Sequence, residues 1–229
     1  MPYRRLPNTD QARLRALRTL LDKGSKSIPY SLPFAAKKFL EIQAFLPLFD
    51  QAVTMYKQSY DRQAACGKVL AENFKSCKLY VSHFIQVLNF CIIRNEIKAD
   101  VRPLFGMKVE DKAVPEITSE QQLIVLGDKV IKGEETRGSM GGTRIYNPSI
   151  AIVKVKYEKF VESYNNHKNL QITTQKFHDK MVDTRIQADA IILSAWNEIE
   201  EAYINLDVEE KRQKCSELGI VYLLRSTER

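Results

Sequence analysis

Residues 70–91 read LAENFKSCKLYVSHFIQVLNFC, and this stretch carries the pattern that determines the fold class. Its apolar side chains recur at alternating steps of four and three residues, which is the spacing of one face of an α-helix. These side chains are Leu70, Phe74, Cys77, Val81, Phe84, Leu88 and Cys91. Such a continuous apolar seam predicts a long helix that packs against other helices in a bundle.

The same spacing recurs on both sides of this stretch. Toward the N-terminus it runs through Phe39, Ile42, Leu46, Phe49, Val53, Tyr56 and Tyr60. After Pro148 it resumes through Val153, Tyr157, Phe160 and Tyr164, and then through Phe177, Met181, Ala188, Ile192 and Ala195. We expect turns near Asp61 and Asn169, because both residues can cap the helix that follows, with Gly67 as a competing boundary for the first turn. The prediction is an all-α fold, an elongated four-helix bundle made of two long helical hairpins.

Helix-capping residues also occur near both ends of the chain. Asn8 or Thr9 can cap a first helix that Gly24 ends, and Asp207 can start a last short helix that Gly219 ends. We predict a single helical domain over residues 1–229. Its segments in order are an N-terminal basic helix and loop (1–32), the first hairpin (33–98), an insertion (99–148), the second hairpin (149–206), and a C-terminal helix with an extended tail (207–229).

The insertion differs from the rest of the chain because it holds six of the nine glycines. A helix is expected over residues 119–132, with a capping box formed either by Ser119 and Gln122 or by Thr118 and Gln121. The run between Gly133 and Gly142 favours a mobile loop. An extended segment at 220–224 could form one minor β-pairing with residues 143–146 of the insertion.

The residue types needed for catalysis or metal binding do not occur at the right spacings. None of the three histidines follows a glutamate by three residues, and no two histidines stand four apart, which disfavours di-iron and helical zinc sites. A G-x-S-x-G turn is also missing. Gly133 and Gly138 have the spacing of a phosphate-binding loop, but Ser139 and Met140 follow where Lys and Ser/Thr belong. We predict no catalytic residues, no metal ligands and no cofactor, and therefore a non-enzymatic protein.

The positive charge is concentrated at the N-terminus. Residues 1–50 carry nine Lys/Arg against four Asp/Glu, residues 51–100 carry seven against four, and the remainder carries nineteen against twenty. The arginines nearest the N-terminus are Arg4, Arg5, Arg13, Arg15 and Arg18. Arginines can contact phosphates, so one hypothesis is a nucleic-acid-binding accessory protein that uses these five residues. They do not form one helix face, and no nucleic-acid-binding motif surrounds them.

The leading hypothesis is instead a helical interaction or scaffold protein that binds a protein partner or associates with itself, because long seams occur without a catalytic set. A third hypothesis is a small-ligand-binding helical bundle, with a pocket between the hairpins and under the loop from Gly133 to Gly142. A ligand cavity between helices could be lined by Trp196, Tyr56, Tyr60, Tyr157 and Tyr164, although aromatic residues at helical spacing more often belong to the core.

Two observations bear on the compartment. No apolar run approaches the roughly 18 to 20 residues that span a bilayer, so we expect no membrane insertion. The cysteines Cys66, Cys77, Cys91 and Cys215 form no C-x-x-C pair, and we expect buried free thiols in a reducing, cytoplasmic setting.

The opening MPYRRLPNTD, residues 1–10, is followed by a helix rich in arginine and leucine. It resembles the start of an uncharacterised family of bacterial helical proteins. The resemblance covers little more than the first twenty residues. It implies a bacterial, cytoplasmic setting and carries over no catalytic or binding position.

Overall fold

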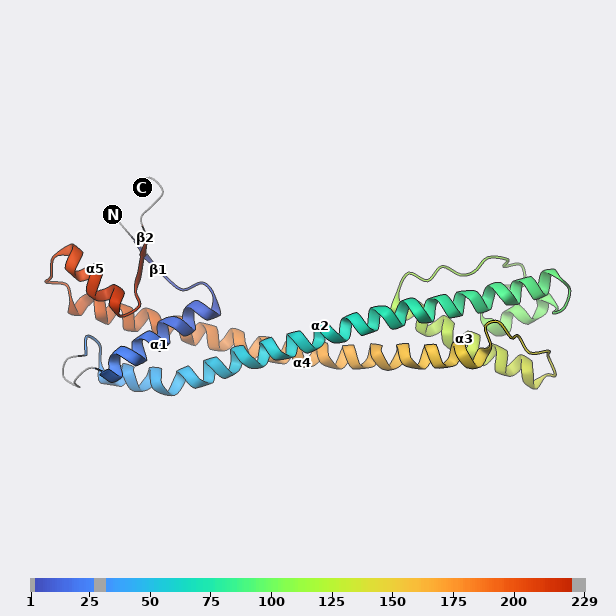
Figure 1. The fold of residues 1–229 in the computed structure, drawn as a ribbon, viewed down its shortest axis with the longest axis horizontal. Coiled ribbons are helices and arrows are strands. Elements are labelled where there is room, and N and C mark those ends of the chain that lie inside the picture. Colours follow the sequence, from blue (N-terminus) through green and yellow to red (C-terminus); the bar gives the residue numbers. More distant parts are fainter. Residues whose placement is uncertain (1–2, 27–31, 224–229) are drawn as a thin grey trace. The chain divides into compact units, whose positions relative to one another are not determined.

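The computed structural model describes residues 3–26 and 32–223, and the described chain is mostly helical (76%) with a minor antiparallel sheet of two strands. This confirms the predicted helical class. The elements in order are β1 (Tyr3–Arg5), α1 (Asp10–Lys26), α2 (Ala36–Ile93), the 3₁₀ helix η1 (Ala99–Phe105), α3 (Glu120–Ser139), α4 (Ile150–Ala202), α5 (Val208–Glu217) and β2 (Val221–Leu223) (Figure 1).

Helices α2 and α4 are each continuous, so the predicted turns at Asp61 and Asn169 are wrong. An Asp or Asn caps a helix only where the residues before it leave helical geometry. Neither position is preceded by a proline or by a glycine that would end the first helix. The bundle of two hairpins is therefore not confirmed, and two unbroken helices take its place.

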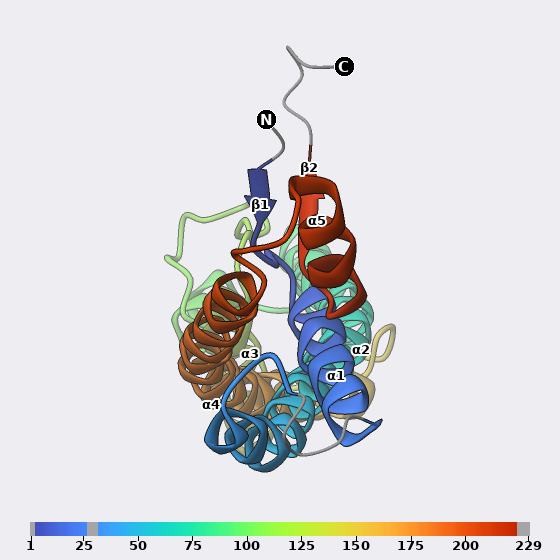
Figure 2. The same ribbon diagram turned by 90° about the vertical axis from the view of Figure 1, so that its left-hand side faces the viewer.

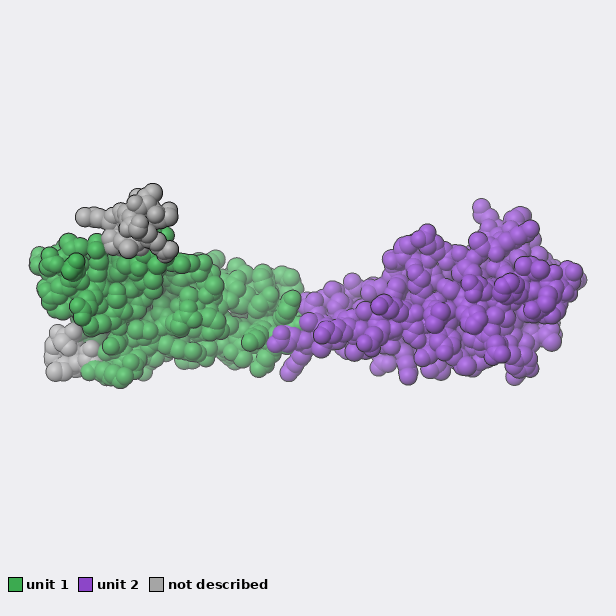
Figure 3. Space-filling view, turned by 45° about the horizontal axis from the view of Figure 1, so that its top comes forward, with its two compact units in different colours: residues 1–60, 173–229 green, residues 61–172 purple. Residues whose placement is uncertain are grey.

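The chain divides into two compact units, shown in different colours in Figure 3. Unit 1 comprises Met1–Tyr60 and Thr173–Arg229, and unit 2 comprises Asp61–Ile172. Each unit contains one part of α2 and one part of α4. The predicted single domain over residues 1–229 stays a prediction, and residues 27–31 of its first segment lie outside the described part.

In unit 1, four helical parts share one hydrophobic core: α1, the beginning of α2, the end of α4, and α5. Figure 2 shows how these helices are arranged. The tyrosine ring of Tyr56 contacts His178, and the Ser59 and Thr174 hydroxyls are hydrogen-bonded at 2.9 Å, so α2 and α4 are antiparallel here. The largest fully buried side chains of this core include Trp196, Phe49, Leu14, Leu17, Leu20 and Ile42.

In unit 2, the seam of residues 70–91 forms the centre of the core, as its spacing predicts. Val81, Phe84 and Leu88 are fully buried, and they belong to one cluster with side chains of η1, α3 and α4. The Ser119 capping box is present as predicted: the Ser119 hydroxyl accepts from the Gln122 amide, and the Gln122 side chain accepts from the Ser119 amide.

The loop predicted from Gly133 onward is largely wrong, because α3 continues to Ser139. A Cβ at Gly133 would lie 2.6 Å from the carbonyl oxygen of Leu104, and a Cβ at Gly127 would lie 2.5 Å from the Tyr157 ring. Glycine at these two helical positions allows close approach of η1 and α4 to α3. These glycines serve helix packing rather than chain flexibility.

The predicted β-pairing exists with a different partner. β2 pairs antiparallel with β1, with Arg4 opposite Tyr222, and not with residues 143–146. The Arg4 guanidinium and the Tyr222 hydroxyl both donate to the Glu200 carboxylate of α4, at 2.9 and 2.7 Å, which holds both strands at one place. Residue 224 of the predicted segment lies outside the described residues.

Other predicted helix ends agree closely with the structure. Thr9 caps α1 by accepting from the Ala12 amide, although α1 continues past Gly24 to Lys26. Asp207 caps α5, and Gly219 follows it with a φ of 92°, in the left-handed region.

One helix of the described chain, α2, is long and apolar enough by length and composition to cross a membrane, with an 18-residue window of mean hydropathy 1.3. The expectation that no stretch reaches this length is therefore wrong for α2. About 39% of that window is buried inside the protein, and core helices of soluble proteins can pass the same test of length and composition.

Candidate functional site

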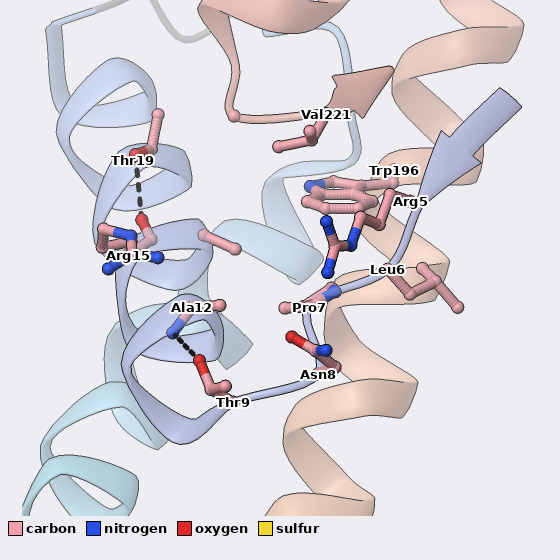
Figure 4. A pocket seen from close by; sticks show the side chains of 12 residues that line it. Arg5, Leu6, Pro7, Asn8, Thr9, Ala12, Arg15, Thr19, Trp196 and Val221 are labelled. Atoms are coloured by element: carbon pink, nitrogen blue, oxygen red, sulfur yellow. Dashed lines mark hydrogen bonds between the residues drawn. The ribbon is translucent and has the colours of Figure 1, made fainter. Parts of the chain in front are cut away.

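A cavity of about 560 Å³ opens in unit 1 where the N-terminal strand leads into α1 (Figure 4). Its wall comes from four parts of the chain: the segment after β1, the first turns of α1, Trp196 of α4, and the connection between α5 and β2. The volume falls in the usual range for small-molecule sites.

Local structure places each wall of this cavity. Pairing of the two strands puts Arg5 opposite Val221. Ala12 and Ala16 are one turn apart on α1, and their small side chains leave space on the cavity side. A Cβ at Gly219 would lie 3.3 Å from Thr19, so the missing side chain lets the end of α5 lie close to α1.

Trp196, the only tryptophan of the chain, forms part of the wall. Its side chain is 1% exposed, and its indole Nε1 has no hydrogen-bond partner among the described residues. A buried donor without an acceptor costs roughly 1–3 kcal/mol. Figure 4 shows the Arg5 guanidinium beside the Trp196 ring, and the indole nitrogen on the side that faces α1.

Three of the five arginines predicted for nucleic-acid binding are already paired with carboxylates. Arg13 makes two hydrogen bonds of 2.8 Å to Asp189. Arg4 pairs with Glu200 and Arg18 with Asp50, each at 2.9 Å. These arginines hold α1 and β1 against the longer helices.

The remaining two, Arg5 and Arg15, both line the cavity. They are exposed, and neither guanidinium makes an ion pair or a hydrogen bond within the described residues. The structure therefore brings together two of the five predicted residues at one site and places the other three in ion pairs.

The carboxylates around the cavity are occupied by other groups. Asp10 accepts two hydrogen bonds of 2.6 Å from Arg185, and its carboxylate raises the pKa of that guanidinium. Burial raises the pKa of the Tyr222 hydroxyl, which also donates to Glu200. No Asp or Glu is among the described lining residues, so the cavity carries an excess of positive charge.

The lining also contains no His or Cys among the described residues, which leaves no obvious general base or thiol nucleophile at the cavity. Across residues 3–26 and 32–223, no group of three or more His, Cys, Asp and Glu side chains is placed to hold a metal ion. The arrangement is suited to binding an anion.

Sequence reasoning located this site only in part. Of the aromatic residues predicted to line a cavity, Trp196 lines this one, whereas Tyr56, Tyr60, Tyr157 and Tyr164 do not. The cavity lies beside the N-terminal segment rather than under residues 133–142. Leu6 and Gly219 were missed as lining residues, because their role depends on the pairing of the two ends of the chain. No local pattern in the sequence announces that pairing.

Comparison with known proteins gives no match to any family model, curated protein or solved structure. The ligand of the cavity is therefore inferred only from the side chains that line it.

Proposed function

We propose that this chain is a non-enzymatic helical binding protein whose unit 1 binds an anionic ligand in the cavity beside Trp196. The observation that carries the proposal is the pair of cavity arginines, Arg5 and Arg15, that lack a described partner while the neighbouring arginines are paired. Guanidinium groups bind carboxylates and phosphates with charge-assisted, often two-point hydrogen bonds.

A second candidate function is the protein interaction that the seams favour. Large apolar side chains are exposed on α2 of unit 2, among them Leu79, Phe90 and Ile93, which are 64%, 57% and 67% exposed. Exposed apolar side chains of this kind support binding of a protein partner or self-association. Nucleic-acid binding is less well supported, because three of its five proposed contacts are engaged in ion pairs.

For the location, we propose the cytoplasm. All four cysteines are free, and Cys77, Cys91 and Cys215 are buried. Free buried thiols support a reducing compartment.

The proposed function can be tested with the fluorescence of Trp196, since no other tryptophan contributes. The protein is titrated at constant ionic strength with acetate, octanoate, inorganic phosphate and a single-stranded DNA oligonucleotide. We expect at least one anion to change the emission saturably. Replacing Arg15 by Ala should weaken that binding by at least about tenfold, the effect of losing one charged hydrogen bond.

Arg18→Ala is the matched control, because Arg18 lies on the same helix but pairs with Asp50 outside the cavity. Unchanged affinity in this control supports the cavity. If no anion binds, or if Arg18→Ala weakens binding as much as Arg15→Ala, the proposed site is wrong. Tight binding of the oligonucleotide alone would favour the nucleic-acid hypothesis instead.

A further inference from the structure

We infer that the ligand of this cavity is a small organic carboxylate with an apolar body, an inference that rests on the proposed anion-binding function. The cavity combines two unpaired guanidiniums, partly exposed apolar side chains and a buried indole N–H without an acceptor. Each of these features restricts a different part of the ligand.

The two guanidinium groups favour a carboxylate as the charged group of the ligand. Within the same unit, Arg13 and Arg185 each grip a carboxylate through two nearly equal hydrogen bonds, to Asp189 and Asp10. Arg5 and Arg15 each offer the same planar donor set to a carboxylate brought from outside. Such two-point contacts are the preferred geometry between arginine and a carboxylate.

Phosphate sites commonly add backbone amides at a helix N-terminus to the side-chain donors. Here two of the four N-terminal amides of α1 are engaged: the Ala12 amide donates to the Thr9 hydroxyl and the Arg13 amide to the Thr9 carbonyl. The Ala12 and Arg13 amides are therefore not free to add to a phosphate site, whereas a carboxylate needs only the guanidinium donors.

The remaining lining selects an apolar body. Leu6 and Val221 are 46% and 48% exposed and are lining residues of this cavity together with Pro7, Ala12 and Ala16. Leu6 and Pro7 also line a second cavity of about 230 Å³, bounded by Ile192 and Leu193 of α4. Covering such side chains is favourable by roughly 25 cal/mol per Å².

The indole N–H supplies the last donor. Less than 1 Å² of Trp196 Nε1 is accessible, so an acceptor reaches it only after a lining side chain moves. Arg5 lies beside the ring (Figure 4) and has no described partner that would hold it there. Arg5 is therefore free to move when it pairs with a ligand carboxylate. We expect that carboxylate to lie close enough to the indole to accept its N–H.

The test compares ligands that share one part and differ in the other, using the full chain and Trp196 fluorescence. Octanoate and acetate differ in the apolar body, whereas octanoate, octyl phosphate and 1-octanol differ in the head. We expect octanoate to bind at least about tenfold more tightly than acetate, because several methylenes are buried. It should also bind more tightly than octyl phosphate and 1-octanol.

The double variant Arg5→Ala, Arg15→Ala should lower octanoate affinity to that of 1-octanol, while Arg18→Ala should leave it unchanged. Equal affinity for acetate and octanoate would contradict the claim that the ligand has an apolar body, but not the proposal that the cavity binds anions. Tighter binding of octyl phosphate than of octanoate would contradict the claim that the charged group is a carboxylate. Absence of binding by every anion, inorganic phosphate included, would overturn the proposed function itself.

Discussion

Unit 2 surrounds its buried arginines with acceptors, whereas unit 1 leaves two arginines without a described acceptor beside a cavity. In unit 2, Arg102 donates to the Asn89 side chain and to the Val109 carbonyl. Arg137 donates to both oxygens of Glu134 and to the Thr143 carbonyl. In unit 1, Arg5 and Arg15 line the cavity with no such contacts.

The difference separates two uses of the same side chain. A buried guanidinium with several acceptors fixes the surrounding backbone, and removing it leaves other polar groups unpaired. An exposed guanidinium without acceptors contributes little to folding and is available to a ligand. Arg102 and Arg137 are therefore interpreted as structural residues of unit 2, and Arg5 and Arg15 of unit 1 are proposed to bind the ligand.

The largest expected effect concerns the closed core of unit 2. Phe84→Asp should destabilise the protein by more than about 4 kcal/mol, because an unpaired charge would replace a fully buried ring. Urea denaturation followed by circular dichroism measures this. Leu79→Asp, on the exposed side of the same helix, should change stability by less than about 0.5 kcal/mol; equal losses in both variants would mean that the core is misassigned.

A smaller loss is expected when the buried ion pair of unit 2 is broken. Arg137→Ala leaves the Glu134 carboxylate, which is 6% exposed, without its cation. The free energy of unfolding should fall by roughly 3–5 kcal/mol. The same denaturation series provides the measurement. A loss under about 1 kcal/mol would mean that buried, paired Arg137 contributes no more to stability than an exposed arginine.

Burial of Cys77 predicts an alkaline pH dependence in unit 2. Burial raises the pKa of this thiol to about 12 from 9.0. Between these pH values the unfolded chain loses the proton and the folded chain keeps it, so stability should fall as the pH rises, by at most about 1.4 kcal/mol per pH unit. Denaturation between pH 8 and 12 should show a shallower slope for Cys77→Ala than for Cys66→Ala; identical slopes would argue against a buried thiol.

The smallest effect is expected for the cavity arginines. Arg5→Ala and Arg15→Ala should each change the free energy of unfolding by less than about 0.5 kcal/mol, because neither side chain has a described partner to lose. A thermal melt of each variant beside Arg13→Ala, which loses the Asp189 contact, provides the comparison. A large loss in Arg15→Ala would mean that this residue is structural.

Sequence periodicity predicted the helical class and the buried seam because the apolar face of a helix repeats locally, as at Val81, Phe84 and Leu88. It failed at Asp61 because a capping residue starts a helix only when the preceding chain bends, and nothing there forces a bend. It also misassigned Gly133, whose small size permits a contact with Leu104 that is distant in sequence.

The site was harder to predict than the fold. Basic composition identified Arg5 and Arg15 but could not separate them from Arg4, Arg13 and Arg18, because the carboxylates that neutralise those three lie far along the chain. The role of Trp196 depends on which acceptors surround its nitrogen, and sequence spacing carries no such information.

The most direct test follows the single indole N–H of Trp196 by NMR in the ¹⁵N-labelled protein. Titration with octanoate should shift this one indole signal downfield and saturate, because the unpartnered donor gains an acceptor. The shift should be lost in the double variant Arg5→Ala, Arg15→Ala and retained in Arg18→Ala. An indole signal that stays in place while octanoate binds, or one that shifts equally in all three proteins, would contradict an arginine–tryptophan site for the ligand.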